Sequence, residues 1–87
     1  MRIINSLNNI DLPYDMIHIQ LTYQDETDDA PMCYKVEAGF TKPIQVGEEV
    51  WVLGAYSTHE KQIDAWNKLH KAILSGDKVF VFPSNDI

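Results

Sequence analysis

Two runs of alternating side chains constrain the fold of this chain more than any other feature of its sequence. Residues 16–24, MIHIQLTYQ, place an apolar side chain at every second position, and residues 32–40, MCYKVEAGF, repeat the pattern. A period of two with β-branched and aromatic residues is typical of a strand that buries one face. The two runs are joined by a loop rich in acids with one proline, so we predict an antiparallel β-hairpin.

Three further segments complete the expected order of elements. Residues 50–56, VWVLGAY, form a continuous apolar run, which favours a central strand covered on both faces. Residues 57–77 have the spacing of one amphipathic helix. Residues 78–83, KVFVFP, form a second continuous run, which predicts a last strand ended by its proline.

The helix carries start and stop signals. Ser57 and Glu60 match a capping box, Gly76 stands where a helix-ending glycine belongs, and Asp64 with Lys68 forms an i,i+4 ion pair. Successive residues placed 100° apart predict one broad buried face: Ile63, Trp66, Leu69, His70, Ile73 and Leu74. His59 and His70 are about 16 Å apart along such a helix, too far to share a metal or a proton.

The order β-β-β-α-β predicts an α+β fold: a two-layer sandwich in which one amphipathic helix packs on one face of an antiparallel sheet of three to four strands. A length of 87 residues fits a single domain, residues 1–87. Within it we expect residues 1–15 to form an N-terminal arm or short helix, 16–83 the sheet and helix, and 84–87 a frayed tail.

Charge limits the classes of partner. The formal net charge is −6, and residues 1–60 hold ten of the thirteen acids against three of the seven bases. Such a balance repels nucleic acid and anionic membranes and attracts basic protein surfaces.

Two features that the sequence lacks indicate the cellular compartment: a second cysteine, and a secretory or membrane-spanning segment. A single cysteine, Cys33, cannot form an internal disulfide, which favours a reducing compartment. The first fifteen residues hold one arginine and no apolar core of a secretory signal, and no run reaches the length of a membrane span. We therefore expect a cytoplasmic protein.

The acidic loop between the two alternating runs is the most unusual feature of the chain. It places four carboxylates within five positions: Asp25, Glu26, Asp28 and Asp29. A calcium loop of EF-hand type fails, because its glycine and glutamate positions hold Ala30 and Val36. Three interpretations stay open: a solvated loop that keeps the hairpin soluble, a looser Ca²⁺ site, and a surface for a basic partner.

Three more acids extend the predicted binding surface. Glu48 and Glu49 precede the third strand, and Glu37 lies on the second. If the sheet brings them beside the acidic loop, all seven residues form one negative patch that could occupy a basic cleft, in the manner of phosphate mimicry by small acidic inhibitors from mobile elements.

The sequence contains no recognised motif for phosphate binding or zinc binding. No glycine-rich phosphate loop occurs, and one cysteine with three scattered histidines does not match any zinc spacing. We predict no catalytic residues, no metal site and no cofactor. Cys33 is interpreted as a quiet, half-buried thiol.

From Ile17 to Leu74, three antiparallel strands lead through GAYS into a helix, an order that resembles a double-stranded RNA-binding domain. The resemblance implies a shared topology. It does not extend to RNA binding, because the helix start reads THEKQ with Lys61 alone, and the first loop carries four acids where that family approaches RNA.

The sequence therefore favours a small non-enzymatic protein-binding module. It would act by stoichiometric occlusion of a basic surface, such as that of a nucleic-acid-processing protein, as an inhibitor, immunity or anti-defence protein of phage or mobile-element origin. The alternative is a homodimeric structural or accessory subunit, joined through apolar strand surface that one helix cannot cover.

Overall fold

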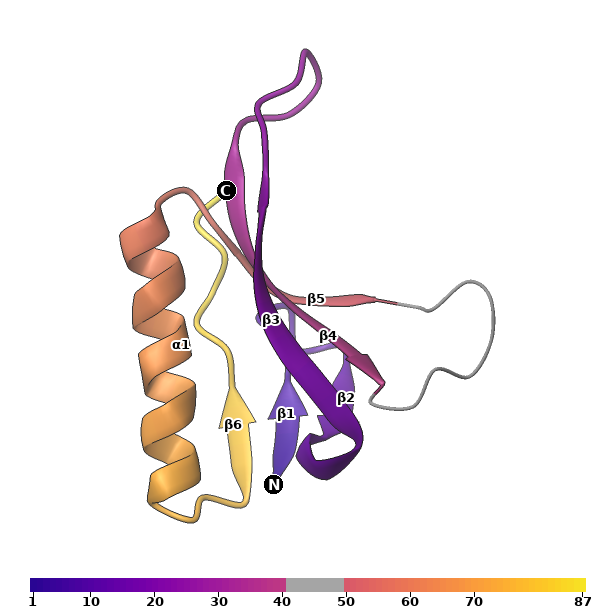
Figure 1. The fold of residues 1–87 in the computed structure, drawn as a ribbon, viewed down its shortest axis with the longest axis vertical. Coiled ribbons are helices and arrows are strands. Elements are labelled where there is room, and N and C mark those ends of the chain that lie inside the picture. Colours follow the sequence, from indigo (N-terminus) through magenta and orange to yellow (C-terminus); the bar gives the residue numbers. More distant parts are fainter. Residues whose placement is uncertain (41–49) are drawn as a thin grey trace.

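The computed structural model describes residues 1–40 and 50–87 (Figure 1). In chain order, the elements are β1 (Arg2–Ile4), β2 (Asp11–Pro13), the 3₁₀ turn η1 (Tyr14–Met16), β3 (Ile17–Gln24), β4 (Cys33–Phe40), β5 (Trp51–Tyr56), α1 (His59–Leu74) and β6 (Val79–Val81). This is an α+β fold with one helix, as predicted. No helix in the described part of the chain is both long and apolar enough to cross a membrane.

The main sheet is antiparallel, with the strand order β3-β4-β5. The predicted hairpin is confirmed: β3 and β4 pair without interruption from Ile17 opposite Phe40 to Gln24 opposite Cys33. Apolar residues therefore face apolar residues across the pair, as with Leu21 and Val36. β5 was expected at the centre of the sheet but lies at its edge. Half of its residues are therefore not buried, and Val52 is exposed.

A second sheet, with the order β2-β1-β6, contains the chain's two ends. The expectation of an N-terminal arm or helix is wrong, because residues 2–4 and 11–13 pair as antiparallel strands. Asn5 closes the turn between them: its side-chain oxygen accepts from the amides of Asn9 and Ile10, both at 2.9 Å. β6 pairs parallel to β1, so the predicted last strand forms but joins the second sheet.

Helix α1 begins one residue later than the capping box predicted. Thr58 is the N-cap, and its hydroxyl accepts from the amide of Lys61 at 3.2 Å. At the other end the prediction is confirmed: Gly76 has a φ of +72°, its amide donates to the Ile73 carbonyl, and the Asp77 amide donates to Ala72, as in a Schellman motif. The ion pair between Asp64 and Lys68 is also present, at 3.0 Å.

The buried face of α1 is rotated from the predicted one. Its buried residues are Gln62, Ala65, Leu69 and Ala72. Leu74 is 89% exposed and His70 is exposed, which corrects their assignment to the core. The small residues at the centre of this face let the helix lie close to β4 and β5.

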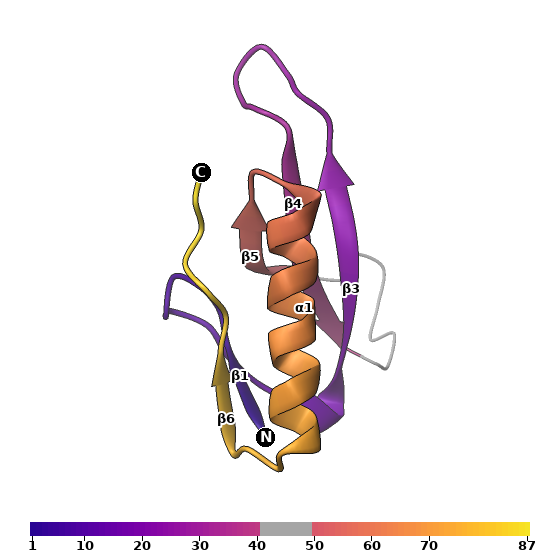
Figure 2. The same ribbon diagram turned by 90° about the vertical axis from the view of Figure 1, so that its left-hand side faces the viewer.

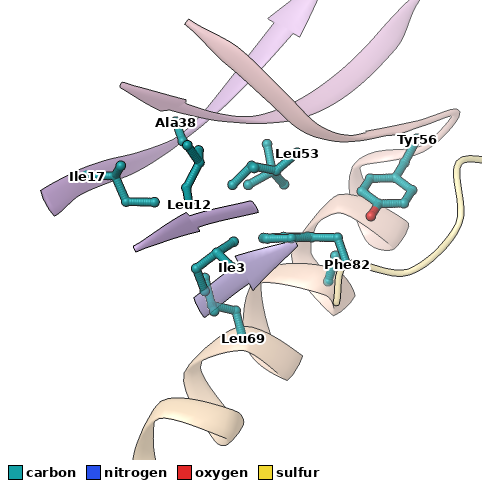
Figure 3. Packing of buried hydrophobic residues seen from close by; sticks show 10 residues of the cluster. Ile3, Leu12, Ile17, Ala38, Leu53, Tyr56, Leu69 and Phe82 are labelled. Atoms are coloured by element: carbon teal, nitrogen blue, oxygen red, sulfur yellow. The ribbon is translucent and has the colours of Figure 1, made fainter. Parts of the chain in front are cut away.

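One hydrophobic core joins all three parts of the molecule. α1 and the second sheet lie side by side against one face of the main sheet (Figures 1 and 2). Figure 3 shows four side chains that meet between these parts: Ile3 from β1, Leu53 from β5, Leu69 from α1, and Phe82 from residues 82–87, which we call the C-terminal segment. Because Ile3 is fully buried, the N-terminal strands are part of this core.

Tyr56 connects this core to the C-terminal segment. Only 2% of the residue's surface is exposed, and its hydroxyl donates to the Pro83 carbonyl at 2.9 Å. A Cβ at position 54 would lie 2.4 Å from that hydroxyl, so the ring occupies space that only glycine leaves free. Burial, and then the nearby charge of Asp86, raises the pKa of Tyr56 to about 12.

The last residues are held in place, which corrects the expected frayed tail. Asn85 accepts from the hydroxyl of Ser6 and from the amide of Ala55, at 2.5 and 2.9 Å. Asp86 accepts from both the amide and the hydroxyl of Ser57, and from the Lys61 ammonium. The C-terminal segment therefore lies along the free edge of β5.

Candidate functional site

The β3–β4 hairpin extends beyond the start of α1, and its tip, residues 25–32, forms one end of the molecule's longest dimension (Figures 1 and 2). This hairpin tip holds the predicted acidic loop. Its four acids, Asp25, Glu26, Asp28 and Asp29, are all exposed; we call them the tip carboxylates.

The tip is a closed turn. The Thr27 amide donates to the Ala30 carbonyl at 2.8 Å, and the Ala30 amide donates to the Thr27 hydroxyl at 3.1 Å. Asp28 and Asp29 are the two central residues of this turn, so their side chains are presented outward by hydrogen-bonded backbone. A hydrogen-bonded turn therefore holds the backbone that carries these two carboxylates.

Tyr23 holds the base of the tip. Its hydroxyl donates a hydrogen bond to the Asp25 carboxylate. This bond, and then the negative charge of Asp25, raises the pKa of Tyr23. Its ring packs against that of Tyr34 across the strand pair, with centroids 5.6 Å apart.

No tip carboxylate is neutralised within the described residues. The ion pairs in residues 1–40 and 50–87 join Arg2 to Asp11, Lys61 to Asp86 and Lys68 to Asp64. Four negative charges are therefore gathered at one end of the molecule without a cation of the described chain to balance them. Like charges so close together repel each other and create a strong local field.

The other acids of the predicted surface are placed differently. Glu37 lies half-buried in the middle of β4, about 13 Å along the strand from Cys33 at the base of the tip. Glu48 and Glu49 lie outside the described residues. The described structure therefore brings together the tip carboxylates and separates Glu37 from them.

A shallow hollow of about 370 Å³, the β3 hollow, lies below the tip between β3 and the first turn of α1. It is lined by Leu21, Thr22, Tyr23, Tyr34, His59 and Gln62. The ring of His59 packs on Tyr34 with centroids 5.7 Å apart, and its Nδ1 lies 2.9 Å from the Gln62 side-chain oxygen. Its walls therefore combine aromatic rings with polar groups, as ligand-binding surfaces commonly do.

Gln62 fixes the floor of this hollow. It is 98% buried, and its amide nitrogen donates to the carbonyls of Thr22 and Lys35, each at 2.9 Å. The helix start is thereby bonded to both strands of the hairpin. Sequence reasoning did not identify Gln62; its signal is the spacing with Ala65, Leu69 and Ala72, which places it on the buried stripe.

Ser57, Lys61 and Asp86 form a second charged cluster, at the start of α1. The hydrogen bond from the Lys61 ammonium, followed by that from the Ser57 hydroxyl, holds the pKa of Asp86 well below its ordinary value. Because each member bonds another, the cluster helps to attach the C-terminal segment, together with the bonds of Tyr56 and Asn85.

The histidines and the cysteine are dispersed. His70 is exposed, and its Nδ1 lies 2.9 Å from the Trp66 carbonyl, while His18 lies over Gly39 on the far side of the main sheet. Cys33 is more buried than predicted, with 6% of its surface exposed. In residues 1–40 and 50–87, no three metal-binding side chains are grouped closely enough to hold an ion.

No protein-family model matches the chain, and neither curated proteins nor solved structures gave a match.

Proposed function

We propose that this chain is a non-enzymatic protein-binding module that occupies a basic surface of a partner protein. The observation that supports the proposal is the hairpin tip, which projects four exposed carboxylates that no described cation balances. Charge of one sign on a protruding element speeds association with a surface of opposite charge.

The hydrogen bonds within the tip add to this argument. A loop that is already hydrogen-bonded loses little conformational freedom when a partner binds, so more of the interaction energy contributes to affinity. A solvated loop kept only for solubility would not need the turn at Thr27–Ala30 or the bond from Tyr23.

Binding through a projecting tip suits stoichiometric occlusion. The mode of action would be that of an inhibitor, an immunity protein or an accessory subunit, and origin in a phage or mobile element is part of the proposal. So is a cytoplasmic location, with which a single buried thiol at Cys33 is compatible. Glu37, Glu48 and Glu49 remain predicted contacts.

Affinity capture from the lysate of the source cells tests the proposal. The tip variant carries Asp25→Asn, Glu26→Gln, Asp28→Asn and Asp29→Asn. A control variant of equal charge change carries Asp15→Asn, Glu60→Gln, Asp64→Asn and Asp77→Asn, all at exposed positions. We expect one basic protein to be retained by the wild type and the control variant and lost by the tip variant. Equal retention by all three proteins, or no retention, would contradict a binding role for the tip.

A homodimeric subunit is the second candidate, and one observation favours it. β6 is an edge strand of the second sheet, and its Val79 and Val81 are about half exposed on the outer face beside Ile4. Pairing of two such faces would bury apolar surface. Light scattering at micromolar concentration distinguishes the candidates: a mass of twice 10.0 kDa that returns to 10.0 kDa in Val79→Thr/Val81→Thr supports the dimer, and a wild-type monomer contradicts it.

A further inference from the structure

The main sheet has two edges, and the chain protects one of them. Along the edge strand β5, the Leu53 carbonyl accepts from the Ser6 amide at 2.7 Å. The amide of Ala55 donates to Asn85, and that of Ser57 donates to Asp86 at 2.8 Å. Residues from both ends of the chain thereby satisfy main-chain groups of β5 that a foreign strand could otherwise pair with.

Among residues 1–40 and 50–87, no comparable contacts protect the other edge. β3 ends the strand order, and no other described strand pairs with its outer side. Its eight residues, IHIQLTYQ, contain no lysine, proline, glycine or acid, and its register with β4 is unbroken. The register shift of the main sheet lies instead between β4 and β5, at Val36 and Glu37. A long, regular, uncharged edge is what a strand from another chain can extend.

The pairing pattern identifies the main-chain groups on that open side. In an antiparallel sheet, the amide and carbonyl of successive residues point alternately to the two neighbouring strands. The Ala55 amide of β5 points away from β4, because it donates to Asn85. Lys35 lies opposite Ala55 in the sheet, so the amide and carbonyl of Lys35 point away from β5, toward β3. Thr22 lies opposite Lys35 on β3, so its amide and carbonyl point toward β4. It follows that Ile19, Leu21 and Tyr23 direct their amides and carbonyls to the open edge.

The β3 hollow lies beside the same residues. Leu21 and Tyr23 line it from β3, and His59 lines it from α1. A strand added to β3 would place every second side chain on the helix side of the sheet, where the hollow lies. An apolar or aromatic side chain at one such position could contact Tyr34 and His59.

Charge determines which strand fits. The tip carboxylates follow the C-terminal end of β3, and an added antiparallel strand would begin beside them. A basic N-terminal end is therefore complementary. A second copy of this chain is not, because its antiparallel β3 would bring the acidic Asp15 in η1 toward the carboxylates.

We propose that β3 accepts an extended segment of a partner protein as an additional antiparallel strand, with lysine or arginine at its N-terminal end beside the tip and an apolar side chain in the β3 hollow. The proposal rests on the proposed function and specifies the partner's chemistry.

A random dodecapeptide library displayed on phage, selected on the wild-type full chain, provides the probe. Selected peptides are synthesised, and their affinities are measured by calorimetry. Each backbone amide is then methylated in turn, which removes one donor and leaves the side chains unchanged. We expect binding tighter than about 100 μM, and a loss of roughly two- to tenfold per blocked hydrogen bond at every second position only.

Variants of the protein test where the peptide binds. We expect His59→Ala and the tip variant to weaken binding. His70 packs against Trp66 farther along α1, and we expect His70→Ala to leave binding unchanged. Amide hydrogen exchange at Ile19, Leu21 and Tyr23 should slow when peptide is added.

Three results would overturn the inference: no selected peptide, a methylation profile without alternation, or slow exchange at these amides in a dimer without peptide. Each is compatible with capture of a folded basic partner through the tip, so the proposed function is judged separately by the capture experiment.

Discussion

At the scale of the residue, a few side chains bond to positions far away in the sequence, and these were the hardest to predict. Ser57 and Glu60 have the spacing of a capping box, yet the Ser57 hydroxyl bonds Asp86, 29 residues later, and Thr58 caps the helix. Asp64 and Lys68, four residues apart, pair as predicted. Local spacing therefore identifies local bonds, whereas a competing distant partner is visible only in the fold.

Gln62 is expected to stabilise the fold and the β3 hollow together. Gln62→Ala removes a buried side chain that donates to two main-chain carbonyls of the hairpin, so we expect it to lower the free energy of unfolding by about 1–3 kcal/mol. Asn67→Ala, at an exposed position of the same helix, should change it by less than about 0.5 kcal/mol. Urea denaturation measures both, and equal midpoints would show that the bonds of Gln62 contribute nothing.

Gly54 is expected to tolerate no side chain. Gly54→Ala places a Cβ against the buried ring of Tyr56, and overpacking of this kind costs about 1–3 kcal/mol. Gly39→Ala meets the ring of His18, whose exposed side chain can turn away, so we expect a smaller loss. Thermal denaturation of the two variants compares them; the reverse order would contradict the role given to Tyr56.

At the scale of the element, periodicity predicted the β3–β4 hairpin and the helix, because both have long, regular patterns. The strands of the second sheet are three residues long, too short to show a period. The parallel pairing of β1 with β6 joins the two ends of the chain, which no local pattern specifies. The face of α1 was misplaced because its buried residues include small and polar ones rather than the largest apolar ones.

The C-terminal segment gives an element-scale prediction about pH. The folded pKa of Asp86 lies below its ordinary value of 3.8, so its contribution to stability is present above that pH and is lost as pH falls through the folded pKa. We expect Asp86→Asn to be less stable than wild type at pH 7 and the difference to shrink progressively below about pH 3.8.

Lys61→Met should produce the same convergence, because it removes the main partner of Asp86. Urea midpoints at pH 7 and at lower pH measure it. A difference between wild type and Asp86→Asn that stays constant over that range would show that the carboxylate does not hold the segment by its charge.

At the scale of the whole molecule, charge and shape give the functional account. The net charge of −6 predicted an attraction to basic surfaces, and the structure concentrates four of the thirteen acids at one projecting end. Sequence could identify these carboxylates because they are adjacent in the chain. It could not identify the β3 hollow, whose walls come from β3, β4 and α1, nor the contrast between the two edges of the main sheet, which depends on strand order.

The association rate of the captured partner, measured against ionic strength from about 0.05 to 0.5 M, tests the central claim most directly. If the tip carboxylates steer binding, the wild type and the control variant associate rapidly at low salt and slow steeply as salt is added. The tip variant should associate slowly at every salt concentration, with a shallow dependence. Equal rates and equal salt dependence for the wild type and the tip variant would contradict the account.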